Sequence, residues 1–372
     1  MPSTSLAAEL ALLPAGLRSR LAARGFSAEK LVTWAHTLGP GSDARNRLAG
    51  RVEPVAASDV GSPPVAGEAL ERARAVGEAA LARGELAICV LAGGMATRMG
   101  GVVKALVEVL PGTTFLDVRL AERRALAERY GREAPLWLMT SEPTEPGIAE
   151  RLGGARDGYA VATFEQFVSL RLRPDGALFR DGAGEPSVYA TGHGDLPDAL
   201  RASGLLASFL ARGGRHVWIS NLDNLGARVD PAILGWHIGH GGPLTVELVD
   251  KRAGDVGGGP VRHEGRPIVC EHFRLPVGFD AASVPVFNTN TFLVSAAALA
   301  ALVFEWTYVE VHKKVGELEA VQFERLLGEL SVPLTPSFLR VPRDGAASRF
   351  VPVKDVRDLA AAAAFVEASG GG

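Results

Sequence analysis

The sequence predicts an α/β protein built on a mostly parallel, doubly wound sheet. From residue 86 onward, short apolar runs alternate with stretches of helical periodicity, which is typical of such sheets. The clearest strand is Leu86–Leu91, an unbroken apolar run that ends in a glycine-rich turn, as buried strands often do. An amphipathic helix over Gly67–Arg83 leads into that strand. Ligands of these sheets bind beyond the carboxyl ends of the strands, so we look for function in the turns there.

The first 85 residues are predicted to form a helical region packed on the core. Residues 6–38 have the pattern of two or three short helices. Residues 52–65 are rich in Pro, Ser and Gly, and an extended connection is expected there.

The remaining elements alternate along the chain. Helices are predicted at residues 115–130, 146–152, 196–212 and 360–365, and strands at 135–139, 161–164, 216–219, 244–249 and 267–273. A hairpin is expected at 170–176. The turns after Leu91, Met139 and Ile219 should therefore converge at one edge of the sheet.

Composition excludes several classes of protein. With 39 basic and 42 acidic residues, the net charge is −3, which gives no electrostatic reason to expect nucleic acid or an anionic membrane as a partner. No apolar run approaches the roughly 20 residues that a membrane helix needs, and no signal-peptide pattern is present. Cys89 and Cys270 lie in apolar surroundings, which suggests reduced core thiols. We expect a soluble, cytoplasmic protein.

The glycine-rich turn at residues 92–101 has the composition of a phosphate site. Glycines allow the backbone N–H groups to approach an anion, and Arg98 and Lys104 supply positive charge. The spacing fits neither a Walker loop nor a G-x-G-x-x-G fingerprint. A tight turn with no ligand is the alternative for this stretch.

Three further stretches carry polar groups that could bind a ligand. Asp223, beside Asn221, lies where a carboxylate can hold Mg²⁺ on phosphates, although such residues also form turns without a ligand. His193 lies between glycines just before a predicted helix. Asn288 and Asn290 interrupt an apolar run, which suits a hydroxyl-rich ligand or a buried turn network equally.

A series of segments, in order over residues 86–359, resembles the eukaryotic-type UTP:glucose-1-phosphate uridylyltransferases, or UDP-glucose pyrophosphorylases, of the UDP-sugar pyrophosphorylase family. The segments are LAGGMATRMG from Leu91, PLWLMTSEPT from Pro135, FEQ from Phe164, GHGDLPDAL from Gly192, SNLDNLGARVDPAIL from Ser220, DVGGG from Asp255, FNTNTFLV from Phe287, AVQFERLLGE from Ala320 and RFVPVKDVRDL from Arg349. The resemblance implies a GT-A-like nucleotidyltransferase core with a mixed, mostly parallel central sheet flanked by helices, and makes residues 86–372 the catalytic domain.

The resemblance also implies a reaction and the residues that perform it. The sugar phosphate of glucose 1-phosphate attacks the α-phosphate of UTP in line, giving UDP-glucose and pyrophosphate reversibly with Mg²⁺. The implied catalytic residues are Arg98, Lys104 and Lys313. The implied nucleotide-binding residues are Leu91, Ala92, Gly93, Gly94, Thr97, Met139, Gln166, Gly192 and Asn221. The sugar phosphate would contact His193, Gly258, Glu271, Asn288, Asn290 and Lys354, and the metal would bind Asp223.

The chain departs from the family pattern at three positions. Ala96 stands at a glycine position, Val103 stands where relatives have proline, and Gly257 replaces a lysine. Two alternatives therefore stay open, namely the same chemistry on an N-acetylhexosamine 1-phosphate or several sugar 1-phosphates, and a non-catalytic sugar-nucleotide sensor. The chain ends soon after Lys354, so no C-terminal β-helix domain is expected and the resemblance does not transfer an oligomeric state.

Overall fold

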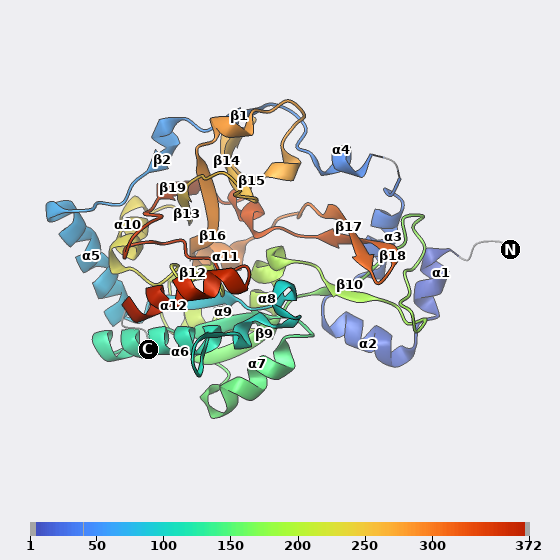
Figure 1. The fold of residues 1–372 in the computed structure, drawn as a ribbon, viewed down its shortest axis with the longest axis horizontal. Helices are drawn as coiled ribbons and strands as arrows, with labels where there is room; N and C mark the ends of the chain where they lie inside the picture. Colours follow the sequence, from blue (N-terminus) through green and yellow to red (C-terminus); the bar gives the residue numbers. More distant parts are fainter. Residues whose placement is uncertain (1–4, 40, 369–372) are drawn as a thin grey trace.

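A computed structural model describes residues 5–39 and 41–368. Its centre is an eight-stranded sheet of order β2-β19-β13-β16-β12-β3-β8-β9 (Figure 1). The strands in that order are Val60–Gly61, Pro336–Arg340, Leu244–Asp250, Val286–Ser295, His216–Asn221, Leu86–Leu91, Leu136–Thr140 and Val161–Glu165. Strand β16 is antiparallel to both of its neighbours, and all other neighbouring strands are parallel. The predicted mixed, mostly parallel sheet is confirmed.

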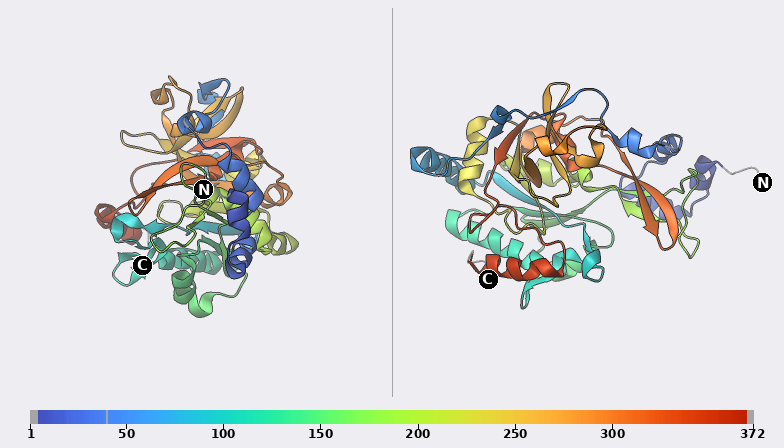
Figure 2. Two further views of the ribbon diagram at one scale, coloured as in Figure 1. Left: turned by 90° about the vertical axis from the view of Figure 1, so that its right-hand side faces the viewer. Right: turned by 45° about the horizontal axis from the view of Figure 1, so that its top comes forward.

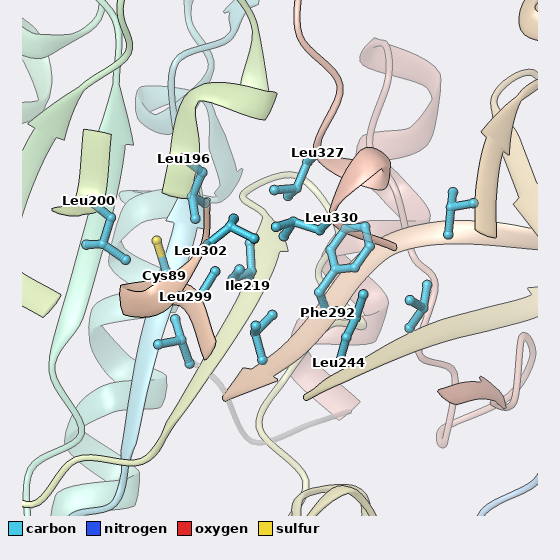
Figure 3. Close-up of a cluster of buried hydrophobic side chains, with 14 of the residues drawn as sticks. Cys89, Leu196, Leu200, Ile219, Leu244, Phe292, Leu299, Leu302, Leu327 and Leu330 are labelled. Atoms are coloured by element: carbon cyan, nitrogen blue, oxygen red, sulfur yellow. The ribbon is translucent and has the colours of Figure 1, made fainter. Parts of the chain in front are cut away.

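Helices cover both faces of this sheet because its strands are apolar on both sides. Ala87 and Cys89 of β3 pack on one face, with α8, α9 and α11, while Ile88 and Val90 pack on the other, with α6 and α7. Figure 3 shows part of the first cluster, in which Cys89 lies among leucines of these helices. The helices are α5 Gly67–Ala82, α6 Phe115–Tyr130, α7 Glu145–Leu152, α8 Leu196–Ala202, α9 Leu205–Ala211, α10 Pro231–His240, α11 Ala296–Ala301 and α12 Leu359–Ala368.

The N-terminal helices lie at one end of the molecule. They are α1 Leu6–Ala11, α2 Ala15–Ala23, α3 Ala28–Ala35 and α4 Ser42–Asn46. Helices α1 to α3 lie beside β10 (Val168–Leu170), β17 (Val309–Val315) and β18 (Leu318–Glu324) in each view (Figure 1, Figure 2). Leu21 and Leu31 share a buried cluster with Leu170 and Phe323. The helices therefore support the antiparallel pair β17–β18, which projects from the core.

Small sheets complete the structure. Strand β1 (Val52–Pro54) pairs with β14 (Gly258–His263), which pairs with β15 (Arg266–Glu271). The other short strands are β4 Met95–Ala96, β5 Val102–Val103, β6 Glu108–Leu110, β7 Thr113–Thr114 and β11 Val188–Ala190. The expected extended connection at residues 52–65 thus contributes β1 and β2. No helix in the described ranges combines the length and the apolar character needed to cross a membrane.

Some predicted elements differ from the structure. The helix predicted at 196–212 is two helices, because the chain breaks at Ser203 and Gly204, where Gly204 has a left-handed φ of 78°. The strand predicted at 267–273 ends at Glu271, because residues 272–274 form a 3-10 turn. The predicted hairpin turns at Arg173–Gly176 and is closed by a bridge between Leu172 and Leu178.

Candidate functional site

A cleft of about 570 Å³ opens at the carboxyl ends of β3 and β12. Asn221, the last residue of β12, pairs in register with Leu91, the last residue of β3, so the turns that follow both strands meet. The predicted site residues that line this cleft are Leu91, Ala92, Gly93, Gly94, Lys104, Gln166, Gly192, His193, Asn221, Asp223 and Lys313. The expected convergence of turns is confirmed for these two strands.

The glycine turn forms the floor of the cleft. Its backbone is held by Ser141, whose hydroxyl donates to the Gly93 carbonyl at 2.8 Å, and by the Lys104 N–H, which donates to the Gly94 carbonyl at 3.2 Å. A Cβ on Gly93 would lie 2.7 Å from Gln166 Oε1. A side chain at position 93 would therefore displace the Gln166 amide, which glycine leaves in place.

The departures in this turn leave its backbone intact. Ala96 has φ −80° and ψ 68°, which a residue with a Cβ can adopt. Val103 has φ −62°, close to the value to which a proline is locked. The two residues lie in the antiparallel pair β4–β5. Ala96 and Val103 thus have ordinary backbone angles for residues with a side chain.

Opposite charges meet inside the cleft. Lys104 Nζ forms an ion pair with the Asp223 carboxylate. Lys313 lines the cleft from β17 and is exposed, with no ion pair to any residue in the described ranges. Glu324, which sequence reasoning did not select, also lines the cleft and accepts a hydrogen bond from Gln322 Nε2 at 2.5 Å. Glu324 lies within the AVQFERLLGE segment that carries part of the resemblance, but only the packing of β18 shows that it lines the cleft.

His193 is held as a neutral ring. Its Nδ1 accepts a hydrogen bond from the Leu327 N–H at 2.9 Å. Burial lowers the pKa of His193 to about 4, so the ring is uncharged near neutral pH. With Nδ1 as the acceptor, the ring proton is on Nε2, which makes that nitrogen a hydrogen-bond donor.

The predicted sugar residues lie beside the cleft and connect to it through one hydrogen bond. Asn290 Nδ2 donates to Asn221 Oδ1 at 2.8 Å. Asn290 has a left-handed φ of 58° at an irregularity in the register of β13 and β16, and its N–H donates to Asn288 Oδ1 at 3.0 Å. Gly258 pairs with Glu271, and burial raises the pKa of the Glu271 carboxyl. The stretch from Asn288 to Asn290 lies within strand β16, which runs from Val286 to Ser295.

Besides Gly258, Glu271, Asn288 and Asn290, four other predicted residues lie outside the cleft lining. Met139 is fully buried beneath it, and its carbonyl accepts the Ala92 N–H at 2.8 Å. Thr97 and Arg98 are exposed on a 3-10 turn. Lys354 is also exposed and follows Val353, whose N–H donates to the Asp223 carbonyl at 3.0 Å.

Arg98 and Lys354 belong to one neighbourhood. The pKa of Asp355 is lowered to about 2, mainly by a hydrogen bond from Arg357. The charge of Arg98 makes a smaller contribution in the same direction. Asp355 directly follows Lys354 in the chain. Arg98 therefore lies near the end of the Lys354 segment, at the rim rather than in the cleft.

The cleft offers oxygen donors suited to a metal ion that is also bound by phosphate. No group of three or more His, Cys, Asp or Glu side chains suited to a metal is found in residues 5–39 and 41–368. Asp223 is the acidic side chain at the end of β12, and Asn221 adds an amide oxygen nearby. Mg²⁺ on a phosphate ligand commonly uses one or two protein carboxylates, with phosphate and water oxygens in the remaining positions. The residues present fit that mode of binding.

Fold and cleft together define a class of protein. It is an α/β protein whose mostly parallel sheet presents a glycine turn, lysines and a carboxylate at its carboxyl edge, as nucleotide-binding proteins do. A family model described as UTP–glucose-1-phosphate uridylyltransferase matches residues 52–366. The chain belongs to this UTP–glucose-1-phosphate uridylyltransferase family.

Individual relatives agree with that assignment. The chain is 32% identical to a UTP–glucose-1-phosphate uridylyltransferase of Musa acuminata over 293 residues, covering 74% of this chain and 62% of the relative. A Saccharomyces cerevisiae enzyme of the same name is 30% identical over 295 residues, covering 74% and 58%. The chain thus spans about three fifths of the length of these curated relatives.

Solved structures share the fold. UDP-glucose phosphorylase from Trypanosoma brucei superposes with a TM-score of 0.75 at 22% identity, covering 93% of this chain and 77% of that chain. A UDP-glucose pyrophosphorylase variant from Leishmania major in complex with UDP-glucose gives 0.72 at 22% identity, covering 97% and 79%.

Proposed function

We propose that this protein transfers the uridylyl group of UTP reversibly to glucose 1-phosphate, releasing pyrophosphate. The observation that carries the proposal is the convergence of Gln166, Lys104, Lys313 and Asp223 on one cleft of about 570 Å³. These residues come from four separate parts of the chain, and the family resemblance gives each a task on the same pair of substrates. Family membership supports the same reaction.

The reaction requires two anions to be brought together. An oxygen of the sugar phosphate forms a bond to the α-phosphorus of UTP, and the bond from that phosphorus to the bridging oxygen of pyrophosphate breaks. Positioning and charge compensation provide most of the catalysis in such a displacement. We assign the charge compensation to Lys104 and Lys313, with Arg98 and Lys354 at the rim.

Neutral groups orient the substrates. We assign the uracil base to Gln166, which lies against the Gly93 backbone, and the sugar phosphate to the Nε2–H of His193. A neutral donor can bind a phosphate oxygen without adding charge to the cleft. Asn221 and Asn290, joined by their hydrogen bond, connect the base end of the site to the predicted sugar residues Glu271 and Asn288.

Mg²⁺ is proposed to be held by Asp223. When bound, it would neutralise charge on the phosphate oxygens of UTP. Asp223→Asn should then weaken Mn²⁺ binding measured by electron paramagnetic resonance in the presence of UTP, and should lower turnover by roughly 10²-fold. Mn²⁺ binding equal to that of the parent protein would exclude Asp223 as the ligand.

The proposed reaction is tested by pyrophosphate release from UTP with a panel of sugar 1-phosphates. Glucose 1-phosphate is the expected best substrate, and a strong preference for N-acetylglucosamine 1-phosphate would move the protein to the alternative specificity. The panel should include galactose 1-phosphate, because discrimination between such sugars depends on a few hydrogen bonds, each contributing about 0.5 to 1.5 kcal/mol.

Gly257 favours one further candidate, a sugar-nucleotide sensor without turnover. The family resemblance leads us to expect a lysine at this position, and here a Cβ would lie 2.9 Å from the Phe287 ring. Calorimetric binding of UDP-glucose with no pyrophosphate release at saturating Mg²⁺ would identify a sensor. A cytoplasmic location is also proposed, and the free, buried thiols of Cys89 and Cys270 are consistent with a reducing compartment.

A further inference from the structure

A buried carboxylate lies behind the cleft. Asp195 is fully buried and is not among the residues that line the cleft. Its Oδ2 accepts hydrogen bonds from the Thr191 hydroxyl at 2.6 Å and from the Phe167 N–H at 3.2 Å. Its Oδ1 lies 3.2 Å from Arg325 Nη1, without a hydrogen bond to any group in the described ranges. One side chain thus joins three separate segments.

Each of these segments also carries residues of the cleft. They are Gln166, His193 and Glu324, in chain order. Gln166 directly precedes the residue whose N–H bonds to Asp195, and Glu324 directly precedes Arg325. A displacement of the Asp195 carboxylate would therefore be passed to the cleft through one or two peptide units.

The backbone around Arg325 locks the His193 loop. The Arg325 N–H donates to the Thr191 carbonyl at 2.7 Å, and the Gly194 N–H donates to the Arg325 carbonyl at 3.1 Å. A Cβ on Gly194 would lie 2.6 Å from the Arg325 carbonyl carbon, so only glycine fits. The Leu327 N–H then reaches His193 Nδ1. The ring is thus oriented by the segment that carries Arg325.

Asp195 and Asp198 share the Arg325 guanidinium, and Asp198 also pairs with Arg201. Arg325 is 3% exposed and also forms an ion pair with Asp198. Its Cζ lies 4.5 Å from the centre of the Trp306 ring and 5.7 Å from that of Tyr308. Burial raises the pKa of Asp195 to about 7, against the opposing effect of Arg325. Removing Arg325 would leave the buried Asp195 carboxylate without a charged partner, whereas removing Asp195 would leave Arg325 paired with Asp198 alone.

We propose that Asp195 is a positioning residue for the cleft. It fixes the distance between Gln166 and His193, and therefore between the uracil base and the sugar phosphate of the proposed substrates. The inference rests on the proposed function, because that function assigns the two ligands to the two ends of the cleft.

The test compares Asp195→Asn with a matched variant. Asn keeps the shape of the side chain and one acceptor oxygen but removes the charge. Asp59→Asn is the control, because Asp59 also accepts a backbone N–H, from Ala56 at 2.8 Å, and pairs with Arg262 on two oxygens outside the cleft. Asp195→Asn should lower kcat/KM for UTP by about 10- to 100-fold, since small misplacements of binding groups have effects of that size. Asp59→Asn should change it by less than about 2-fold, within the usual effect of remote substitutions.

A double-mutant cycle separates positioning from general destabilisation. If Asp195 acts through His193, the effects of Asp195→Asn and His193→Gln are not independent. The loss of kcat/KM in the double variant should then be at least about fivefold smaller than the product of the two single losses. Arg325→Lys tests the same positioning role in a second way, because lysine keeps the charge but cannot make the forked contact. It replaces Asp195→Asn in the cycle if that variant does not fold.

The outcomes are distinct. Multiplicative effects in the cycle, or an equal loss of kcat/KM in Asp195→Asn and Asp59→Asn at equal thermal stability, would overturn the positioning role. Absence of turnover in the parent protein would instead overturn the proposed function. In that case the affinity for UDP-glucose, measured by calorimetry, still tests the positioning role of Asp195. An affinity unchanged by Asp195→Asn would refute that role.

Discussion

At the scale of single residues, the cleft depends on contacts that leave no room for an extra atom. Gly93 and Gln166 are the clearest pair, because a Cβ on Gly93 would meet the amide oxygen of Gln166 at 2.7 Å. The atom that must move is at the end of a flexible side chain, so the fold can tolerate the change. The proposed base-reading amide, however, would be displaced from its place.

Gly93→Ala should therefore impair binding more than stability. We expect the KM for UTP to rise about tenfold, which corresponds to roughly 1.4 kcal/mol and lies within the usual cost of overpacking. Gly154→Ala is the control, since nothing lies within 4 Å of a Cβ there and Gly154 does not line the cleft. Steady-state kinetics and thermal unfolding of both variants make the comparison, and equal KM values would contradict the role given to Gln166.

Lys313 is the residue whose removal should affect turnover directly. Lys313→Ala should lower kcat by roughly 10²-fold if its charge acts on the phosphates in the transition state. Lys314→Ala provides the control, because the two lysines are exposed neighbours on β17 and successive strand residues point to opposite faces. Only Lys313 lines the cleft. If both variants retain full turnover, Lys313 has no catalytic role.

At the scale of elements, α5 and α10 pack backbone against backbone. A Cβ on Gly77 of α5 would lie 1.8 Å from the Pro231 carbonyl oxygen, and one on Gly235 of α10 would lie 1.7 Å from that of Ala73. Two glycines thus allow the helices to approach so closely that no side chain fits between them. Helix α10 begins one residue after Asp230, at the end of the loop that carries Asp223. Its position therefore fixes the end of the loop that carries Asp223.

Gly235→Ala should destabilise the fold by about 3 kcal/mol, the upper end of the usual cost of overpacking, because the new methyl group meets rigid backbone. Gly239→Ala, in the same helix but with nothing within 4 Å of its Cβ, should instead stabilise by roughly 0.5 to 1 kcal/mol. Urea denaturation measures both. A loss of stability in Gly239→Ala similar to that in Gly235→Ala would show that the close packing of α5 and α10 is unimportant.

At the scale of the whole molecule, buried imidazoles make stability depend on pH. His237 is 2% exposed, and its Nδ1 lies 2.8 Å from the Thr245 hydroxyl. Burial lowers the pKa of His237 to about 3, with a smaller contribution from His216. Below pH 6.5 the unfolded chain therefore binds a proton at this ring that the folded chain does not bind until about pH 3. Stability must fall as the pH falls through this window.

His237→Asn should reduce that loss. Between pH 6.5 and 4.5 the parent protein should lose roughly 2.5 kcal/mol more than the variant, since a shift of one pKa unit corresponds to 1.36 kcal/mol. Urea unfolding at several pH values measures the difference, in which the other titrating groups largely cancel. Parallel pH profiles for the two proteins would show that His237 is protonated in the folded state at these pH values.

The local signals in the sequence were enough for much of the fold. Apolar runs and helical periodicity predicted β3, β8, β12, α5 and α6. These patterns are long, and in each the apolar positions indicate which side of the element is buried. The sequence also placed the glycine turn and Asp223 at one edge of the sheet, because parallel strands present their carboxyl ends there. The break between α8 and α9 was missed, since a Ser-Gly pair within an apolar helical pattern is a weak stop signal.

By itself, the sequence determined the α/β class, the edge of the sheet that forms the cleft, and most of the residues that line it. Only the tertiary structure decided that β17 and β18 bring Lys313 and Glu324 to that edge, and that Arg325 and Asp195 meet behind it. The reason is physical: local composition sets each element and its buried face, whereas contacts between segments more than a hundred residues apart depend on how those faces pack together.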